Sequence, residues 1–243
     1  MNVYVPEYYS KFRCIASKCQ NTCCAGWEID IDPESLARYQ QITGTFGLRM
    51  KQSISLEGTP HFILSENGRC PFLNQSNLCD LILSEGEDAL CQICRDHPRF
   101  RNYFSSRVEV GLGLVCEEAG RLILSWPSRF RLVRLEGNGK EELTDDERYV
   151  LALRDEWISS LPEEGPTARL MEALIYRHLA DALYDNRLDE RISFIHNAFT
   201  YITSGWKDER LDSLVELARR FSDTVEYDDE VLEGWIAGNS RGG

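Results

Sequence analysis

The sequence predicts a mixed α+β protein, mainly α, in which an irregular cysteine-rich N-terminal domain with short strands precedes a helical bundle. Two observations support this fold class. All nine cysteines lie before residue 117, whereas apolar residues recur with helical spacing through most of the second half. A polar, glycine-containing segment separates the two halves. We therefore expect a cysteine-cluster metal-binding domain over residues 1–126, a linker over 127–147 and a helical domain over 148–243.

The first helix and the first hairpin have clear local signals. "DIDPESLARYQQITG" offers Asp32 as an N-cap, Pro33 in the first turn and Gly44 at the end, which predicts a short helix. Alternating apolar residues flank an Asn-Gly pair in "HFILSENGRCPFL", and this pattern predicts a β-hairpin.

The rest of the front half predicts short elements joined by loops. "LCDLILSEGEDALCQICRDHPRF" predicts one or two short helices broken near Gly86, "YFSSRVEVGLGLVC" has strand character, and "EEAGRLIL" is helical. A domain of such short pieces has a thin apolar core, and metal ligation is a common way to stabilise one.

Four amphipathic patterns in the second half predict the helices of a bundle. The first has Thr144 or Asp145 as its cap, and the second begins with Pro166 in its first turn. The four segments are "DDERYVLALRDEWISSL", "PTARLMEALIYRHLADALYD", "LDERISFIHNAFTYITSGW" and "DERLDSLVELARRFSDTV". The final segment, "DDEVLEGWIAGNSRGG", predicts a short helix followed by a frayed tail.

Composition and charge narrow the classes of partner. The chain has 243 residues, of which 42% are hydrophobic and 28% charged, as in globular proteins. Its net charge of −13 disfavours nucleic-acid binding, which normally uses a basic face. No apolar run approaches the roughly 18 residues that cross a bilayer, and the first residues lack the pattern of a secretory signal. We expect a cytoplasmic protein that binds neither nucleic acid nor membrane.

The cysteines are the strongest compositional signal. Disulfide frameworks favour short secreted chains and an even number of cysteines, and neither condition holds here. Clustered thiols in a reducing compartment instead indicate metal ligation. The candidate metal ligands are Cys14, Cys19, Cys23, Cys24, Cys70, Cys79, Cys91, Cys94 and Cys116.

The spacing of these cysteines leaves the type of centre open. The Cys91-x2-Cys94 spacing lets two thiolates reach one metal, although redox dithiols share it. The adjacent pair Cys23-Cys24 has diverging side chains, so one thiolate is expected to join a centre while its neighbour joins another or packs inward. Thiolate-only ligation selects zinc, copper(I) or an iron–sulfur cluster. We favour a [4Fe–4S] cluster, with zinc as the alternative.

Four segments resemble the flagellin lysine N-methylase family, which belongs to a broader group of zinc- or iron-chelating cysteine-cluster proteins. They contain spaced cysteines ending in CC, a CPFL…C segment and a CRxxP segment, and they cover about the first 125 residues. The segments are "KFRCIASKCQNTCCAGWEIDID", "GRCPFLNQSNLCDLI", "LCQICRDHPR" and "LVCEEAGRLIL".

This resemblance implies an S-adenosylmethionine-dependent protein-lysine N-methyltransferase whose substrate is a flagellin-like protein. Lysine methylation needs a neutral ε-amine in line with the methyl-sulfonium, and an acceptor for its proton. The chain lacks the CxxxCxxC triplet of radical S-adenosylmethionine enzymes, because the residue three beyond Cys23 is Gly26. The "GLGL" at Gly111–Leu114 is a weak glycine motif. Catalytic and cofactor-binding residues are therefore left unassigned.

Other residues near the cysteines have competing interpretations. Trp27 is expected to pack over the metal rather than stack on a ligand. Arg95 and Arg99 are expected to offset thiolate charge rather than to clamp a substrate carboxylate. Three acidic residues after the CC pair could receive a lysine ammonium, although the last also caps a helix: Glu28, Asp30 and Asp32. The histidines expected to be structural are His97, His178 and His196.

Three functional classes remain open from the sequence. The preferred one is a lysine methyltransferase with a cysteine-ligated centre. The second is a non-catalytic metal-binding module for storage, delivery or redox sensing. The third is a metal-stapled interaction protein whose helical half docks a partner.

Overall fold

The chain forms two compact units in a computed structural model that describes residues 1–238. One unit, here called the sheet–helix unit, joins Met1–Arg13 to the chain from Pro98 onward, and the other, the cysteine unit, is Cys14–His97. The predicted mixed α+β class is confirmed. The observed units differ from the predicted domain boundaries at 126 and 147, and the sheet explains the difference.

A four-stranded sheet ties the N-terminus to the second half of the chain. Its order is β4-β5-β1-β6, with β1 parallel to β5 and antiparallel to β6. The strands are β1 (Asn2–Pro6), β4 (Arg99–Tyr103), β5 (Arg107–Leu112) and β6 (Leu132–Glu136). Because β1 lies between β5 and β6, the first residues belong to the sheet–helix unit. The segment predicted as a linker contributes an edge strand.

The helices predicted after residue 144 are all present. The helices of this unit are α5 (Glu117–Leu124), α6 (Asp145–Ser160), α7 (Pro166–His178), α8 (Ala182–Asp185), α9 (Leu188–Gly205), α10 (Leu211–Phe221) and α11 (Asp229–Ile236), with a π-helical turn at Ser222–Glu226. Thr144 caps α6 in a capping box with Glu147. The tail predicted to fray lies largely outside the described residues.

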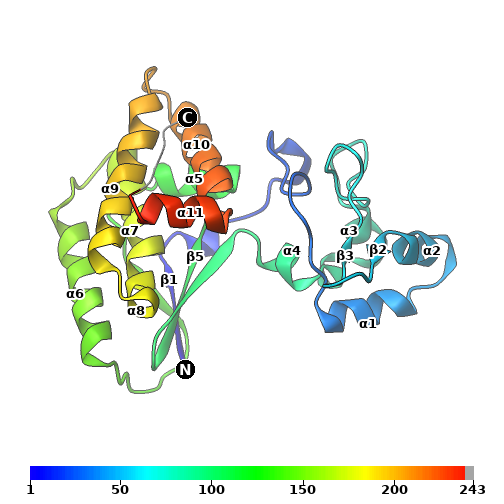
Figure 1. The fold of residues 1–243 in the computed structure, drawn as a ribbon, viewed down its shortest axis with the longest axis horizontal. Helices are drawn as coiled ribbons and strands as arrows, with labels where there is room; N and C mark the ends of the chain where they lie inside the picture. Colours follow the sequence, from blue (N-terminus) through cyan, green and yellow to red (C-terminus); the bar gives the residue numbers. More distant parts are fainter. Residues whose placement is uncertain (239–243) are drawn as a thin grey trace. The chain divides into compact units, whose positions relative to one another are not determined.

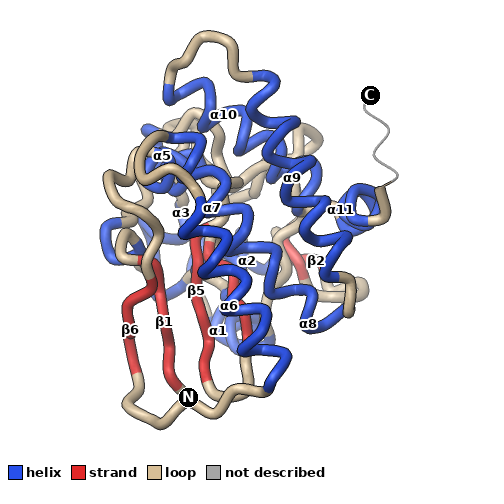
Figure 2. Tube along the Cα trace, turned by 90° about the vertical axis from the view of Figure 1, so that its left-hand side faces the viewer, coloured by secondary structure: helices blue, strands red, loops and turns tan. Residues whose placement is uncertain are grey.

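The helices pack on the sheet rather than only on one another. Figure 1 shows α6, α7 and α8 beside β1 and β5, and Figure 2 shows α6 and α7 against the same strands from another direction. Phe100 of β4 contacts the ring of Tyr176 in α7, with ring centroids 5.4 Å apart. Gly111 of β5 makes this approach possible, since a Cβ there would lie 2.7 Å from the Tyr176 ring.

Two buried carboxylates, Glu109 and Glu226, connect elements of this unit through ion pairs. Arg154 of α6 donates to Glu109 of β5 at 2.6 Å, and both side chains are at most 5% exposed. Glu226 of the π-helical turn lies 2.7 Å from His178 Nε2 and 3.1 Å from Arg177 Nε at the end of α7. Burial alone would raise the pKa of Glu226, but the neighbouring cations outweigh it and lower the pKa to about 2.

The cysteine unit is built from short elements around a small core. They are α1 (Pro33–Gln41), α2 (Gly44–Gln52), β2 (Ile54–Ser55), β3 (His61–Phe62), α3 (Asp80–Glu85) and α4 (Gln92–Asp96), with 3-10 turns at Ala16–Lys18 and Glu87–Ala89. Large side chains fill its centre, including fully buried Tyr39, Met50 and Phe72.

Two local predictions in this unit need correction. Asp32 caps α1 as predicted, but the helix ends at Gln41, and Gly44, predicted as its last residue, begins α2. The Asn-Gly pair does form a turn, in which Ser65 N–H donates to the Arg69 carbonyl at 2.9 Å. The strands beside it do not pair as a hairpin, because Arg69 pairs with Ala25 and β3 pairs with β2.

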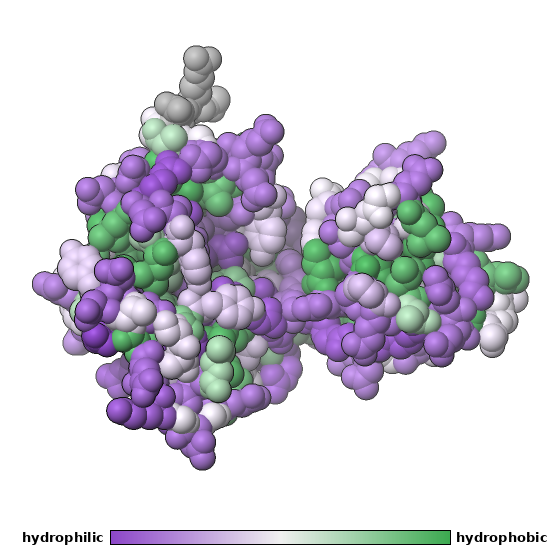
Figure 3. Space-filling view, turned by 60° about the horizontal axis from the view of Figure 1, so that its bottom comes forward, coloured by the Kyte–Doolittle hydropathy of each residue, from purple (hydrophilic) through white to green (hydrophobic). Residues whose placement is uncertain are grey.

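The surface mixes apolar and polar side chains. On the face in Figure 3, hydrophobic residues are interrupted by hydrophilic ones. The exposed large apolar side chains include tyrosines such as Tyr149 and Tyr201. Within residues 1–238, we find no helix that combines the length and the apolar character needed to cross a membrane.

Candidate metal centre

Cys24 and Cys70 lie on paired segments of the cysteine unit. The amide of Cys70 donates to the Cys24 carbonyl at 2.8 Å, and the amide of Gly26 donates to the Gly68 carbonyl at 3.0 Å. Gly68 has a φ of +70°, which suits glycine in this turn. Backbone hydrogen bonds therefore hold these two cysteines close together, although they lie far apart in the sequence.

A tight loop brings Cys79 back to the segment that follows Cys70. Leu73 and Cys79 pair through the backbone in an isolated antiparallel β-bridge, and the Asp80 amide donates to the Phe72 carbonyl at 2.7 Å. The side chain of Asn74 stabilises this loop by accepting from the amide of Leu78 at 3.1 Å. Cys79 then occupies the N-cap position of α3.

Asp32 positions the CxxC segment. One of its carboxylate oxygens accepts from the Ser35 amide at 2.9 Å, and the other accepts from the Gln92 amide at 2.8 Å. These bonds join the start of α1 to the start of α4. Cys91 is the N-cap of α4 and is fully buried, and Cys94 lies one turn later.

Five cysteines share the apolar core of this unit, and we call them the thiol cluster: Cys24, Cys70, Cys79, Cys91 and Cys94. Burial raises the pKa of Cys70 to about 12 and also raises the pKa of Cys79. Negative charge on Cys24 raises both values further, so these sulfurs lie within electrostatic range of one another.

Two thiol pairs within or beside the cluster share hydrogen bonds. The Cys94 thiol donates to the Cys91 sulfur, which lowers the pKa of Cys91 to about 7 and, together with burial, raises the pKa of Cys94. Cys23 hydrogen bonds to Cys24 in the same way, and this bond lowers the pKa of Cys24 to about 7 against the effect of burial. Arg69 adds a smaller lowering.

The other predicted ligands lie outside this core. Cys14 is exposed, and its sulfur accepts from the Ala16 amide at 3.4 Å. Cys19 is half-buried, and its thiol donates to the Asn21 carbonyl at 3.1 Å. Cys116 belongs to the sheet–helix unit, where it is the N-cap of α5. No disulfide joins any of the nine cysteines, all of which lie in the described part of the chain.

The donor chemistry of the thiol cluster fits a thiophilic metal. Five cysteine sulfurs around one apolar core provide the soft ligands that zinc and iron–sulfur clusters take. Across residues 1–238, no three His, Cys, Asp or Glu side chains already converge as a bound metal ion requires. Metal ligation by the nine cysteines therefore stays a prediction.

Of the residues predicted near the thiols, Trp27 and Arg95 lie beside cysteines of the cysteine unit, whereas Arg99 belongs to the sheet–helix unit. Trp27 is half-buried and donates from its indole to the Cys23 carbonyl at 2.7 Å, and its ring lies 6.0 Å from that of His97. Arg95 donates to the Leu90 carbonyl at 2.9 Å. Arg99 lies in β4 of the sheet–helix unit and donates to the Tyr9 hydroxyl.

Arg69 was missed by sequence reasoning, although it directly precedes Cys70. It is the cation that lowers the pKa of Cys24, and its guanidinium also donates to Asn77 at 2.9 Å. Tyr39 was missed as well. It packs beside Cys91 and donates to the Ala89 carbonyl at 2.8 Å.

The remaining candidates have structural surroundings. Glu28 is exposed, and its carboxylate lies 3.9 Å from the His61 ring. Asp30 pairs with His61 through the backbone, in an isolated antiparallel β-bridge. His178 is buried against Glu226, as a structural histidine is expected to be. His196 stacks near Trp157, with centroids 5.0 Å apart.

These features define a two-unit α+β protein with a cysteine-rich unit inserted after its first strand. Its sequence is 27% identical over 139 residues to the lysine-N-methylases of Salmonella typhimurium and Salmonella choleraesuis. It is 28% identical over 139 residues to the flagellar biosynthetic protein FliU of Salmonella muenchen. Each match covers 54% of this chain.

The similarity is distant and partial. The matched region covers 35% of each lysine-N-methylase and 82% of FliU, so the chain spans about a third of the length of these methylases. No family model matches the sequence, and no solved structure matches it either.

Proposed function

We propose that the protein is an S-adenosylmethionine-dependent protein-lysine N-methyltransferase that acts on flagellin or a flagellin-like protein. The observation that carries this proposal is the 139-residue similarity to lysine-N-methylases. The name of the third relative, a flagellar biosynthetic protein, supports the choice of substrate.

The thiol cluster would hold the metal centre of this enzyme, with a [4Fe–4S] cluster favoured over zinc. A bound centre would cross-link the segments that carry Cys24, Cys70, Cys79, Cys91 and Cys94. Such cross-links stabilise a small unit whose apolar core is limited. The centre is thus assigned a stabilising role in this proposal.

Methyl transfer is tested on protein purified without oxygen. The chain is incubated with flagellin and isotopically labelled S-adenosylmethionine, and mass spectrometry of the digested flagellin locates the label. We expect methyl groups on lysine side chains, and arginine or amino-terminal methylation would redirect the proposal. Metal-loaded, folded protein that transfers no methyl group to any lysine would reject it.

A second candidate function is a metal-binding module without methyl transfer. The thiol cluster favours this function, because its cysteines could bind a metal without S-adenosylmethionine or a protein substrate. Calorimetry separates the two proposals. Saturable binding of S-adenosylmethionine by metal-replete protein supports the methyltransferase, whereas stoichiometric metal without such binding supports the module. Elemental analysis with absorption spectroscopy of the same sample identifies the metal.

A further inference from the structure

Helix α1 holds the backbone on both sides of Cys91. Asp32, the N-cap of this helix, accepts from the Gln92 amide at 2.8 Å. Two turns further along α1, the Tyr39 hydroxyl donates to the Ala89 carbonyl at 2.8 Å. One bond lies just after Cys91 in the chain and the other lies two residues before it. A single helix therefore fixes the backbone that carries the first thiol of the CxxC segment.

The two side chains that make these bonds are themselves held in place. Tyr39 is fully buried, and its ring stacks on that of Phe62 with centroids 5.9 Å apart. The other oxygen of Asp32 accepts from the Ser35 amide at 2.9 Å. Because each oxygen of this carboxylate already binds a backbone amide, Asp32 is better suited to holding the chain than to receiving a lysine ammonium.

The Cys91 sulfur lies close to donors from the same elements. It is fully buried, and the Cys94 amide and the Tyr39 hydroxyl are both near enough to hydrogen bond to it. Such donors around a sulfur ligand orient it and adjust the properties of the centre that it binds. Tyr39 therefore contacts both the sulfur of this cysteine and the backbone that leads to it.

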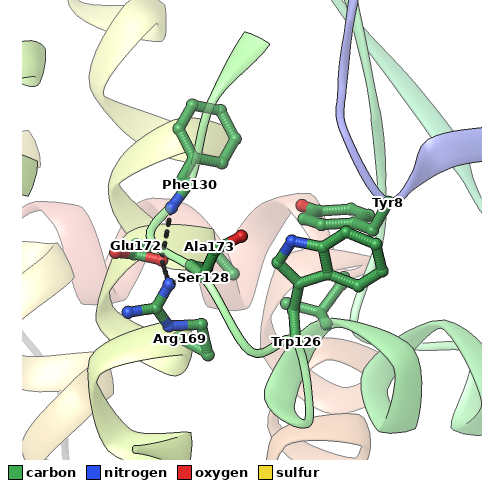
Figure 4. A pocket seen from close by; sticks show the side chains of 8 residues that line it. Tyr8, Trp126, Ser128, Phe130, Arg169, Glu172 and Ala173 are labelled. Carbon is green, nitrogen blue, oxygen red and sulfur yellow. Dashed lines mark hydrogen bonds and ion pairs between the residues drawn. The ribbon is translucent and has the colours of Figure 1, made fainter. Parts of the chain in front are cut away.

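A similar bond between a carboxylate and a distant amide occurs in the sheet–helix unit. Figure 4 shows Glu172 of α7 with the Phe130 amide, from which it accepts at 3.2 Å, and with Arg169, which lies 3.1 Å away. Arg169 neutralises this carboxylate, and the cavity beside it, about 10 Å³, has room for about one water molecule. That bond holds two elements together. Asp32 differs because the amide that it holds directly follows a thiol of the cluster.

We propose that Asp32 and Tyr39 are positioning residues that hold Cys91 in place for the metal centre of the thiol cluster. Groups that orient a metal ligand, without binding the metal, typically change metal affinity 10–100-fold when they are removed. The α1 bonds act in this way, since they limit the movement of the Cys91 backbone. This assignment rests on the metal centre of the proposed function and does not depend on methyl transfer.

Titration of the reduced, metal-free full chain with Co²⁺ under anaerobic conditions tests the proposal. A competing chelator sets the free Co²⁺ concentration, and the sulfur-to-cobalt absorption reports binding by thiolates. Asp32→Asn is the decisive variant, because asparagine caps helices as well as aspartate does, but its amide nitrogen cannot accept from the second backbone amide. We expect Asp32→Asn to weaken Co²⁺ binding about 10–100-fold. Tyr39→Phe keeps the ring and is expected to weaken binding less.

Asp228→Asn is the matched control. Asp228 is the N-cap of α11 and accepts from the Glu230 and Val231 amides of its own helix, so its replacement is expected to leave Co²⁺ binding unchanged. Urea unfolding of the metal-free variants measures stability separately. If Asp32→Asn lowers the urea midpoint but leaves Co²⁺ affinity and absorption as in the wild type, its role is only structural and the proposal is overturned. Should Asp32→Asn fail to fold, Tyr39→Phe takes its place.

The same titration separates this inference from the proposed function. A wild-type chain that binds no Co²⁺ would overturn the thiolate metal centre and the positioning role together. Wild-type binding that Asp32→Asn matches would overturn the positioning role alone and leave the metal centre standing. Weaker binding by Asp32→Asn in a protein that transfers no methyl group would support the positioning role and count against the methyltransferase.

Discussion

Replacing Glu226 with glutamine is expected to destabilise the sheet–helix unit, because the substitution removes the buried negative charge that pairs with Arg177 and His178. Its side chain is fully buried against Arg177 and His178, and Ser222 donates to it. The pKa falls from 4.5 to about 2 on folding. At about 1.4 kcal/mol per pKa unit, the ionised carboxylate contributes roughly 3 kcal/mol to the free energy of unfolding. Removing one partner of a buried ion pair typically costs about 3–5 kcal/mol, which agrees with the value obtained from the pKa.

Urea-induced unfolding at neutral pH measures this cost. The matched control is Glu233→Gln, which removes an exposed carboxylate that pairs with Arg187 at 2.6 Å. Exposed pairs contribute at most about 1 kcal/mol, so the control is expected to unfold near the wild-type midpoint. If Glu226→Gln costs no more than Glu233→Gln, the argument from burial and charge fails.

The pH dependence provides a second check on Glu226. Because folding lowers its pKa, its contribution is fully present above pH 4.5 and is lost as the pH falls towards 2. The difference in stability between the wild type and Glu226→Gln is therefore expected to shrink to roughly 1.5 kcal/mol at pH 3. A difference that grows on acidification would contradict this sign.

Three further predictions concern packing, capping and metal. Gly111→Ala places a Cβ 2.2 Å from the Phe100 ring and 2.7 Å from that of Tyr176, so calorimetry should show a loss of about 1–3 kcal/mol. Gly234→Ala, in an open position of α11, should gain up to about 1 kcal/mol as its control. Thr144→Ala removes the capping box and should cost about 1 kcal/mol in chemical denaturation, and an unchanged midpoint would argue against the cap. Anaerobic chelation of metal-loaded protein should lower its melting temperature, whereas identical melting curves would show that the metal does not stabilise the fold.

Features with local causes were predictable from the sequence. The caps at Asp32 and Thr144 and the first-turn Pro166 identify helices through interactions within a few residues. The helix "EEAGRLIL" appears with its predicted bounds as α5. Helical periodicity and capping are properties of short windows, so a single sequence contains them.

Features that depend on distant pairing were not predictable. Nothing near Asn2 indicates that its strand pairs with Arg107 and with the strand ending at Glu136. The distribution of cysteines suggested a boundary near residue 126, but strand pairing sets it elsewhere. The thiol cluster was predicted only as part of a larger set, because spacing does not show which cysteines share a core.

The insertion of the cysteine unit within the sheet–helix unit sets an order of events during synthesis. Strand β1 leaves the ribosome before both of its hydrogen-bonding neighbour strands, which lie beyond residue 106. The whole of Cys14–His97 is translated in between and can complete its own contacts while β1 waits unpaired. Loss of structure in the inserted segment would prolong that wait and leave an apolar strand open to other nascent chains. If the thiol cluster holds the proposed metal, the supply of that metal would then limit the folding yield of the sheet–helix unit, which contains none of the five clustered cysteines.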